Sequence, residues 1–208
     1  NTSGSSSYGI FVEQSSNYTV SYNNTISSRA TGIRIEGDPS MTTATFTNDT
    51  IVNPSSPLAG YYDVVLSLNA TDITFLNVSF NKSSVSFENA DADKNNLTVR
   101  WFLNVNVTNS TNNNPIANAQ VVINDSFSTN IFNSTTDANG GIATQTVTEY
   151  TQNGSVPFTT GTDTCTDVRN NVNITCFSPY NITANTSDVR NFTSVDVNRS
   201  KFVNVSFG

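Results

Sequence analysis

The 208-residue chain has no histidine, one methionine, one tryptophan and three lysines, and charged residues make up only 12% of it. Without histidine it lacks the commonest metal ligand and the side chain best suited to proton transfer near neutral pH. That absence excludes most catalytic triads and most zinc sites. Nine basic residues against sixteen acidic ones give a net charge of −7, and no two basic residues are adjacent. A nucleic-acid partner needs a dense positive surface, so none is expected.

Long apolar segments are also missing. No run of about 18 apolar residues occurs, so the sequence predicts no membrane span. It begins Asn1-Thr2-Ser3 rather than with Met, and it carries no signal-peptide pattern. We interpret it as a processed mature chain that another component holds outside the cell.

Asparagine, serine and threonine take the place of charge, with 32, 27 and 30 residues. The N-glycosylation acceptor motif Asn-x-Ser/Thr, or sequon, occurs 19 times, whereas composition alone predicts roughly 9 occurrences. The surplus predicts an extracellular or cell-surface glycoprotein with covalent N-linked glycans and no cofactor. The predicted acceptors are Asn1, Asn17, Asn23, Asn48, Asn69, Asn77, Asn81, Asn96, Asn106, Asn109, Asn124, Asn133, Asn153, Asn173, Asn181, Asn185, Asn191, Asn198 and Asn204.

Several sequons stand in alternating segments. Residues i and i+2 of a strand share a face, so the valines of residues 104–108 point one way and the acceptor amide points to solvent. The same alternation in residues 75–80 predicts that Leu76, Val78 and Phe80 point inward. Dense glycans on the outer faces would replace charge as the source of solubility.

The two cysteines, Cys165 and Cys176, flank a polar turn at residues 167–171. An oxidising exterior favours a disulfide between them, and two free buried thiols are the alternative. Their spacing matches no zinc or redox motif.

Helical periodicity is missing and short alternating segments recur, which predicts an all-β fold. In the first half, Gly9-Ile10-Phe11-Val12, Gly32-Ile33-Arg34-Ile35 and Asp63-Val64-Val65-Leu66 each open a unit, and a sequon-bearing strand follows each. The units begin 23 and then 31 residues apart. Repeats of roughly 20 to 30 residues suit the stacked coils of a parallel β-helix. Residues 8–90 resemble the right-handed parallel β-helix repeats, of the pectate-lyase-like kind, of archaeal and bacterial surface proteins. The resemblance implies a short parallel β-helix over residues 1–95; an antiparallel β-sandwich is the alternative.

A polar segment at residues 91–96 is expected to be a linker. Beyond it, the hairpin pattern of residues 112–123, with Pro115-Ile116 and Ala119, precedes a Thr-Asp-x-Asn-Gly turn at residues 136–141. The pair resembles the immunoglobulin-like fold of carboxypeptidase-regulatory-like surface modules. This resemblance implies an immunoglobulin-like β-sandwich over residues 96–208.

Some β-helix proteins cleave acidic polysaccharides with clustered acids, Ca²⁺ and a basic residue. No such cluster stands beside a base here, so we expect no enzymatic activity. The residues considered for it are Glu13, Glu36, Asp38, Asp49, Asp63, Asp72, Arg29 and Arg34. Asp91-x-Asp93 and Asp137-x-Asn139 offer oxygens to Ca²⁺ without the spacing of a full binding loop, and we interpret them as a linker and a turn.

A short stack of β-coils exposes apolar core and unpaired backbone at an end that nothing covers. The sequence therefore predicts a structural subunit of an N-glycosylated extracellular filament or surface assembly, archaeal in character, that joins copies of itself head to tail. Other cell-surface proteins or glycans are further candidate partners. The alternative is an adhesin or stalk module that binds carbohydrate or another cell through Tyr61-Tyr62.

Overall fold

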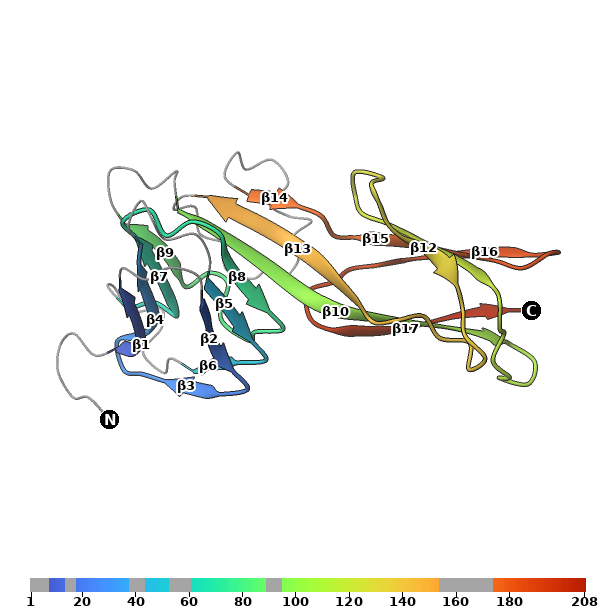
Figure 1. The fold of residues 1–208 in the computed structure, drawn as a ribbon, viewed down its shortest axis with the longest axis horizontal. Helices are drawn as coiled ribbons and strands as arrows, with labels where there is room; N and C mark the ends of the chain where they lie inside the picture. Colours follow the sequence, from blue (N-terminus) through green and yellow to red (C-terminus); the bar gives the residue numbers. More distant parts are fainter. Residues whose placement is uncertain (1–7, 14–17, 38–43, 53–60, 89–94, 154–173) are drawn as a thin grey trace. The chain divides into compact units, whose positions relative to one another are not determined.

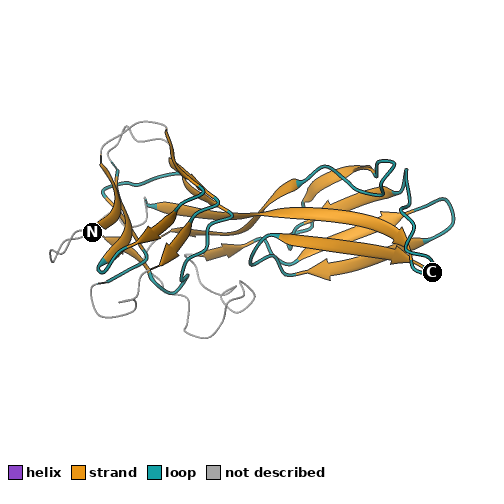
Figure 2. Ribbon diagram, turned by 90° about the horizontal axis from the view of Figure 1, so that it is seen from below, coloured by secondary structure: helices purple, strands orange, loops and turns teal. Residues whose placement is uncertain are grey.

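The computed structural model describes residues 8–13, 18–37, 44–52, 61–88, 95–153 and 174–208. Within these ranges the chain consists of strands, turns and loops without a helix (Figure 2). The predicted all-β class is confirmed. It follows that the described part of the chain has no helix able to span a membrane.

The chain divides into two compact units. The described residues of the N-terminal unit run up to Arg100 and include Tyr150–Asn153 and Ile174–Thr175 from later in the chain. The C-terminal unit holds Trp101–Glu149 and Cys176–Gly208. The long strand β10 (Asn96–Asn109) supplies residues to both.

The described part of the N-terminal unit contains nine short strands before β10. They are β1 (Tyr8–Glu13), β2 (Tyr18–Tyr22), β3 (Thr25–Ser27), β4 (Thr31–Glu36), β5 (Ala44–Thr47), β6 (Thr50–Val52), β7 (Val64–Ser67), β8 (Ile73–Leu76) and β9 (Val85–Glu88). The first sheet is ordered β1-β4-β7-β9, the second contains β10-β8-β5-β2, and the third is β3-β6 (Figure 1). The chain passes through the first, second and third sheets in turn and then repeats the passage; we call one passage a winding.

Strands one winding apart pair in parallel and in register. Ile33 of β4, for example, lies between Ile10 of β1 and Val64 of β7, and Val64 is followed by Val85 of β9. Equivalent side chains therefore stack in columns. Ile33, Val64 and Phe75 have no exposed surface.

Gly9 and Gly32 explain the Gly-Ile motif that opens the first two windings. A Cβ on Gly32 would overlap the side chain of Ile51 and lie 2.6 Å from the carbonyl oxygen of Asp63, and Gly9 is crowded by Ile26 in the same way. Only glycine allows the first and third sheets to approach this closely. In the third winding Asp63 takes this position, and its carboxylate accepts a hydrogen bond from the backbone N–H of Asn81, 2.7 Å away.

The C-terminal unit contains an antiparallel sheet in the order β12-β11-β15-β16. From Leu103 onward, β10 pairs in parallel with β17, the last strand. In the order of the second sheet, β13 stands beside β10 and β14 beside β13. The strands after β10 are β11 (Gln120–Asn124), β12 (Asn130–Thr135), β13 (Gln145–Asn153), β14 (Ile174–Cys176), β15 (Tyr180–Asn185), β16 (Arg190–Val195) and β17 (Lys201–Phe207). Of these, β13 and β14 supply residues to both units.

Three side-chain hydrogen bonds connect segments inside the C-terminal unit. The indole Nε1–H of Trp101 donates to a carboxylate oxygen of Glu149, 2.6 Å away, and the Glu149 residue has no exposed surface. The hydroxyl of Thr136 donates to the carbonyl of Ile116 and accepts from the N–H of Ala119. Thr136 thus joins the two motifs on which the immunoglobulin-like resemblance rests.

Candidate functional site

Three sequon asparagines form a column at the corners of successive windings. Asn23, Asn48 and Asn77 follow β2, β5 and β8, and their φ angles are 61°, 56° and 55°. The backbone N–H of Asn23 donates to the carbonyl oxygen of Thr47 in the next winding, 2.9 Å away. The backbone N–H of Asn48 likewise donates to the carbonyl oxygen of Leu76 at 2.9 Å. The side-chain amide of Asn77 donates to the side-chain oxygen of Asn48 at 2.8 Å. Asparagine tolerates the left-handed conformation better than most residues, so these positions favour asparagine for a structural reason that sequon counting missed.

The corner at Asn77 corrects one prediction. We expected residues 75–80 to alternate as one strand with Leu76, Val78 and Phe80 inward. Instead β8 ends at Leu76, and the buried residues are Phe75 and Val78, while Leu76 and Phe80 are half-buried. The positive φ of Asn77 turns the chain and shifts the alternation by one residue.

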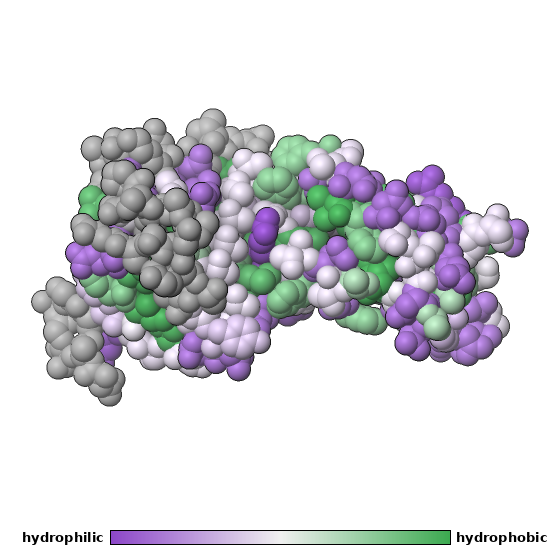
Figure 3. Space-filling view, viewed as in Figure 1, coloured by the Kyte–Doolittle hydropathy of each residue, from purple (hydrophilic) through white to green (hydrophobic). Residues whose placement is uncertain are grey.

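The described acceptors lie at the surface to differing degrees. Asn1, Asn17 and Asn173 lie outside the described residues, and none of the other acceptors is buried. The exposed ones are Asn23, Asn81, Asn133, Asn153, Asn181 and Asn204; the others are half-buried. Val105 and Val107 are buried beside Asn106, as predicted for residues 104–108. In the view of Figure 3, the C-terminal unit presents mostly polar residues with scattered apolar ones.

The first winding has an open edge. Among the described residues β1, β2 and β3 each pair with a strand of the second winding and with nothing on the opposite side. The inward side chains of Ile10 and Val12 are half-buried, whereas their partners Ile33 and Ile35 have no exposed surface. On the outside of the same winding, Phe11 is 44% exposed. The first winding therefore leaves apolar surface and backbone hydrogen-bonding groups uncovered by described residues.

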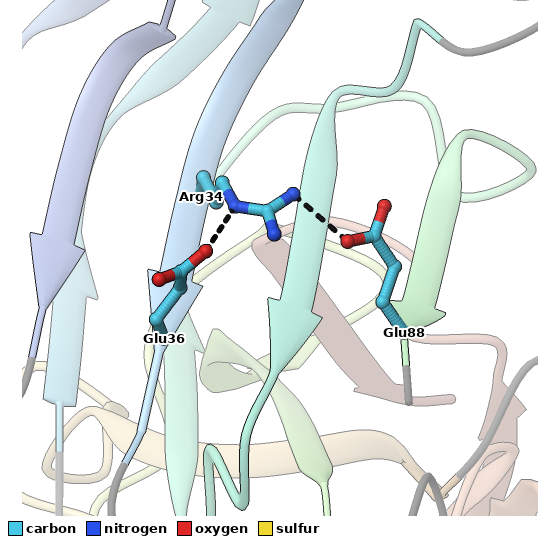
Figure 4. A network of polar contacts seen from close by, with 3 residues as sticks. All are labelled: Arg34, Glu36 and Glu88. Carbon is cyan, nitrogen blue, oxygen red and sulfur yellow. Dashed lines mark hydrogen bonds and ion pairs between the residues drawn. The ribbon is translucent and has the colours of Figure 1, made fainter. Parts of the chain in front are cut away.

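An ion-pair network lies on the outer face of the first sheet. The guanidinium of Arg34 contacts Glu36 at 2.7 Å and reaches across β7 to Glu88 at 2.9 Å (Figure 4). It also lies 5.8 Å from the ring centroid of Tyr8. Partial burial acts to lower the pKa of Arg34, but the hydrogen bonds and charges of Glu36 and Glu88 outweigh it and hold that pKa above its usual value. Arg34 thus joins three strands and stays protonated, which does not suit it to act as a base.

The other acids considered for catalysis have structural partners or lie apart. Asp49 is 1% exposed, and one of its carboxylate oxygens accepts the backbone N–H of Asn24 at 2.7 Å. Glu13 and Asp72 are exposed, as is Arg29, and Asp38 lies outside the described residues. Within the described part of the chain no three acidic or cysteine side chains stand close enough together to hold a metal ion.

The Asp137 segment forms the predicted turn. One carboxylate oxygen of Asp137 accepts the backbone N–H groups of Asn139 at 2.8 Å and Gly141 at 2.9 Å. Gly140 has a φ of +75°, a conformation that glycine adopts without strain. Asp91 and Asp93 lie outside the described residues.

Two further predicted features are only partly described. Cys176 is buried in β14 and is not a free thiol, and its expected partner, Cys165, lies outside the described residues. Tyr61 and Tyr62 are both half-buried, and the residues before them lie outside the described ranges. The pairing of the cysteines and the carbohydrate-binding role of the tyrosines stay predictions.

The chain was also compared with known proteins. No family model, curated protein or solved structure matches it. Its function has to be inferred from the features above.

Proposed function

We propose that this chain is a structural subunit of an N-glycosylated extracellular assembly, and that copies join through the open edge of the first winding. The observation that carries the proposal is that β1, β2 and β3 have partners on one side only among the described residues. A winding is the repeating unit of this stack, so a strand from a second copy can continue each sheet.

The side chains of the first winding support such a contact. Ile10 and Val12 keep exposed surface that their counterparts in the second winding have lost. Phe11 and Tyr22, at 44% and 63% exposure, extend the apolar surface of this winding. Soluble proteins usually shield long edges with charge, proline or a covering segment, because unpaired strands template association. The only charged residue of the first winding's strands is Glu13.

The contact we propose is heterologous. The open edge belongs to one end of the N-terminal unit, so it would meet a different surface of the next copy. A heterologous contact that does not close into a ring generates a filament. Glycans on the outward asparagines of the later windings and of the C-terminal unit would hinder lateral association.

The proposal includes a fold for each of the two units. We interpret the stacked parallel windings as a short β-helix, since three sheets recur in fixed order with residues in register. We interpret the C-terminal unit as immunoglobulin-like on the basis of its antiparallel four-stranded sheet and the contacts of Thr136. The resemblance of both units to modules of surface proteins agrees with a structural role.

The native material tests the proposal directly. Intact-mass measurement on protein from its own cells should exceed the 22.4 kDa of the bare polypeptide by several glycans. Negative-stain microscopy and sedimentation should show linear assemblies whose length grows with concentration. A bare polypeptide mass would contradict the glycoprotein assignment. Glycosylated chains that stay monomeric at high concentration would contradict the subunit assignment.

A further inference from the structure

Some sequon asparagines are direct neighbours across strands. Asn106 of β10 is in register with Asn204 of β17, and Asn124 of β11 is opposite Asn181 of β15. Directly paired residues have side chains on the same face, with Cα atoms about 4.5–5.5 Å apart. The two acceptor side chains of each pair therefore lie next to each other on one face. Sequence spacing alone does not reveal this, because the members of the pairs are far apart in the chain.

The pair Asn106 and Asn204 is asymmetric. Asn204 is exposed, and its amide donates to the hydroxyl of Thr108 at 3.0 Å. Asn106 is half-buried, with Asn204 on one side and Gly141 bridged to it on the other. A Cβ on Gly140 would lie 3.1 Å from the side-chain oxygen of Asn106, so this side chain lies against the turn. Asn204 is the more accessible acceptor.

The pair Asn124 and Asn181 repeats the asymmetry. Asn181 is exposed, whereas Asn124 is half-buried. The side-chain oxygen of Asn124 accepts a hydrogen bond from the amide of Asn130, 3.2 Å away on the neighbouring strand β12. Asn124 is thus flanked on both sides, by Asn130 and by Asn181. Asn181 is again the more accessible member.

A glycan at one member of a pair obstructs its neighbour. The sugar is attached to Nδ2 and projects from the same face over a strand spacing of about 4.8 Å, which is less than the width of a substituted sugar ring. A second glycan rooted at the paired residue would occupy the same space. To avoid this overlap, one of the two asparagines would have to break its side-chain hydrogen bonds, or the strands would have to separate.

We propose that each of these two pairs carries one glycan per chain, at Asn204 and at Asn181, and that Asn106 and Asn124 stay bare while their partners are occupied. The inference rests on the proposed glycosylation of this chain. It adds a selection rule: occupancy follows strand register as well as the sequon motif.

Glycopeptide mass spectrometry on the protein from its glycosylating host tests this rule. Occupancy is measured at both pairs and at Asn133. This exposed acceptor serves as the control, because the residue opposite it is Val122 and not another acceptor. In the unaltered protein we expect high occupancy at Asn204, Asn181 and Asn133, and little at Asn106 or Asn124. In Asn204→Gln, occupancy of Asn106 should rise toward the level of Asn133, and in Asn181→Gln that of Asn124 should rise likewise.

The outcomes separate the rule from the proposal beneath it. No glycan at any acceptor, Asn133 included, contradicts the proposed function. Glycan at Asn133 with both members of either pair occupied on the same chain contradicts only the rule. The rule is also contradicted if Asn106 and Asn124 stay bare after their partners are replaced, because exclusion by a neighbouring sugar would then not explain why they lack a glycan. The two pairs are independent, so a folding defect in one variant leaves the other to decide.

Discussion

The side-chain amide of Asn77 donates a hydrogen bond to the side-chain oxygen of Asn48, 2.8 Å away, although the two residues are 29 positions apart. Both have positive φ angles, and both stand where a strand of the second sheet ends. The contact joins the same corner of two successive windings. The asparagine of the repeated motif therefore has a structural cause at these positions, whether or not it also carries a glycan.

Replacing Asn48 should reveal this structural role. Asn48→Ala removes the acceptor of the Asn77 amide and places a Cβ-bearing residue without a polar side chain in the left-handed conformation, at a cost of about 1–2 kcal/mol. Asn48→Gly removes the same acceptor without the conformational penalty, so it should cost less. Urea unfolding of chain produced without glycans measures both.

The matched control is Asn133→Ala, at an exposed acceptor within β12. It should change the free energy of unfolding by no more than about 0.5 kcal/mol. Equal effects of Asn48→Ala and Asn133→Ala would show that the corner column contributes nothing to stability.

Gly32 should tolerate no side chain. Gly32→Ala places a Cβ against the side chain of Ile51 and 2.6 Å from the carbonyl oxygen of Asp63, and backbone cannot move away as a flexible side chain can. We expect destabilisation of about 1–3 kcal/mol, the usual range for overpacking. Gly141→Ala is the control, because its nearest contact would be an oxygen of Asp137 at 3.7 Å. Thermal unfolding should separate the two variants; an unchanged midpoint for Gly32→Ala would refute the close approach of the first and third sheets.

Trp101 and Glu149 should be energetically coupled. Trp101→Phe removes the Nε1–H that donates to a side-chain oxygen of Glu149 at 2.6 Å, and losing a hydrogen bond to a buried polar group costs about 1–3 kcal/mol. Glu149→Gln keeps an acceptor oxygen but weakens the bond. In that background Trp101→Phe should cost about 1 kcal/mol less, and the smaller ring affects both backgrounds equally. A double-mutant cycle by chemical unfolding measures the difference, and additive effects would mean the bond contributes little.

The repeat was predictable because a similar short apolar motif opens each winding, although the windings differ in length. The motif at Gly9 and Gly32 marks the close approach of two sheets, and alternating burial at Val105 and Val107 follows from strand geometry. The corner at Asn77 was not predictable from alternation, since a single positive φ moves the chain from one sheet to the next without interrupting the polar pattern. A column of asparagines at equivalent places in each repeat was the available signal.

Long-range pairing was beyond the reach of the sequence. Asn106 and Asn204 are in register. Neither segment has a sequence feature that identifies the other as its partner, because the parallel pairing of distant strands depends on the packing of the whole unit. The same holds for Tyr150–Asn153, which belong to the N-terminal unit although they follow much of the C-terminal one in the chain. The predicted boundary between residues 95 and 96 was placed from local composition, which carries no information about such returns.

The open edge of the first winding yields a final prediction. Phe11 lies on β1 with its side chain 44% exposed, so Phe11→Lys should leave the fold intact while placing a charge on an edge strand. Charge on an edge opposes continuation of the sheet by another chain. The variant loses the stacking of Phe11 on Tyr8 and faces Arg34 in register, so its unfolding midpoint should fall slightly; it should remain folded and lose concentration-dependent assembly in sedimentation. Phe127→Lys, at a 60% exposed position in a turn of the C-terminal unit, should assemble normally. If Phe11→Lys assembles as readily as Phe127→Lys, copies do not join through the first winding.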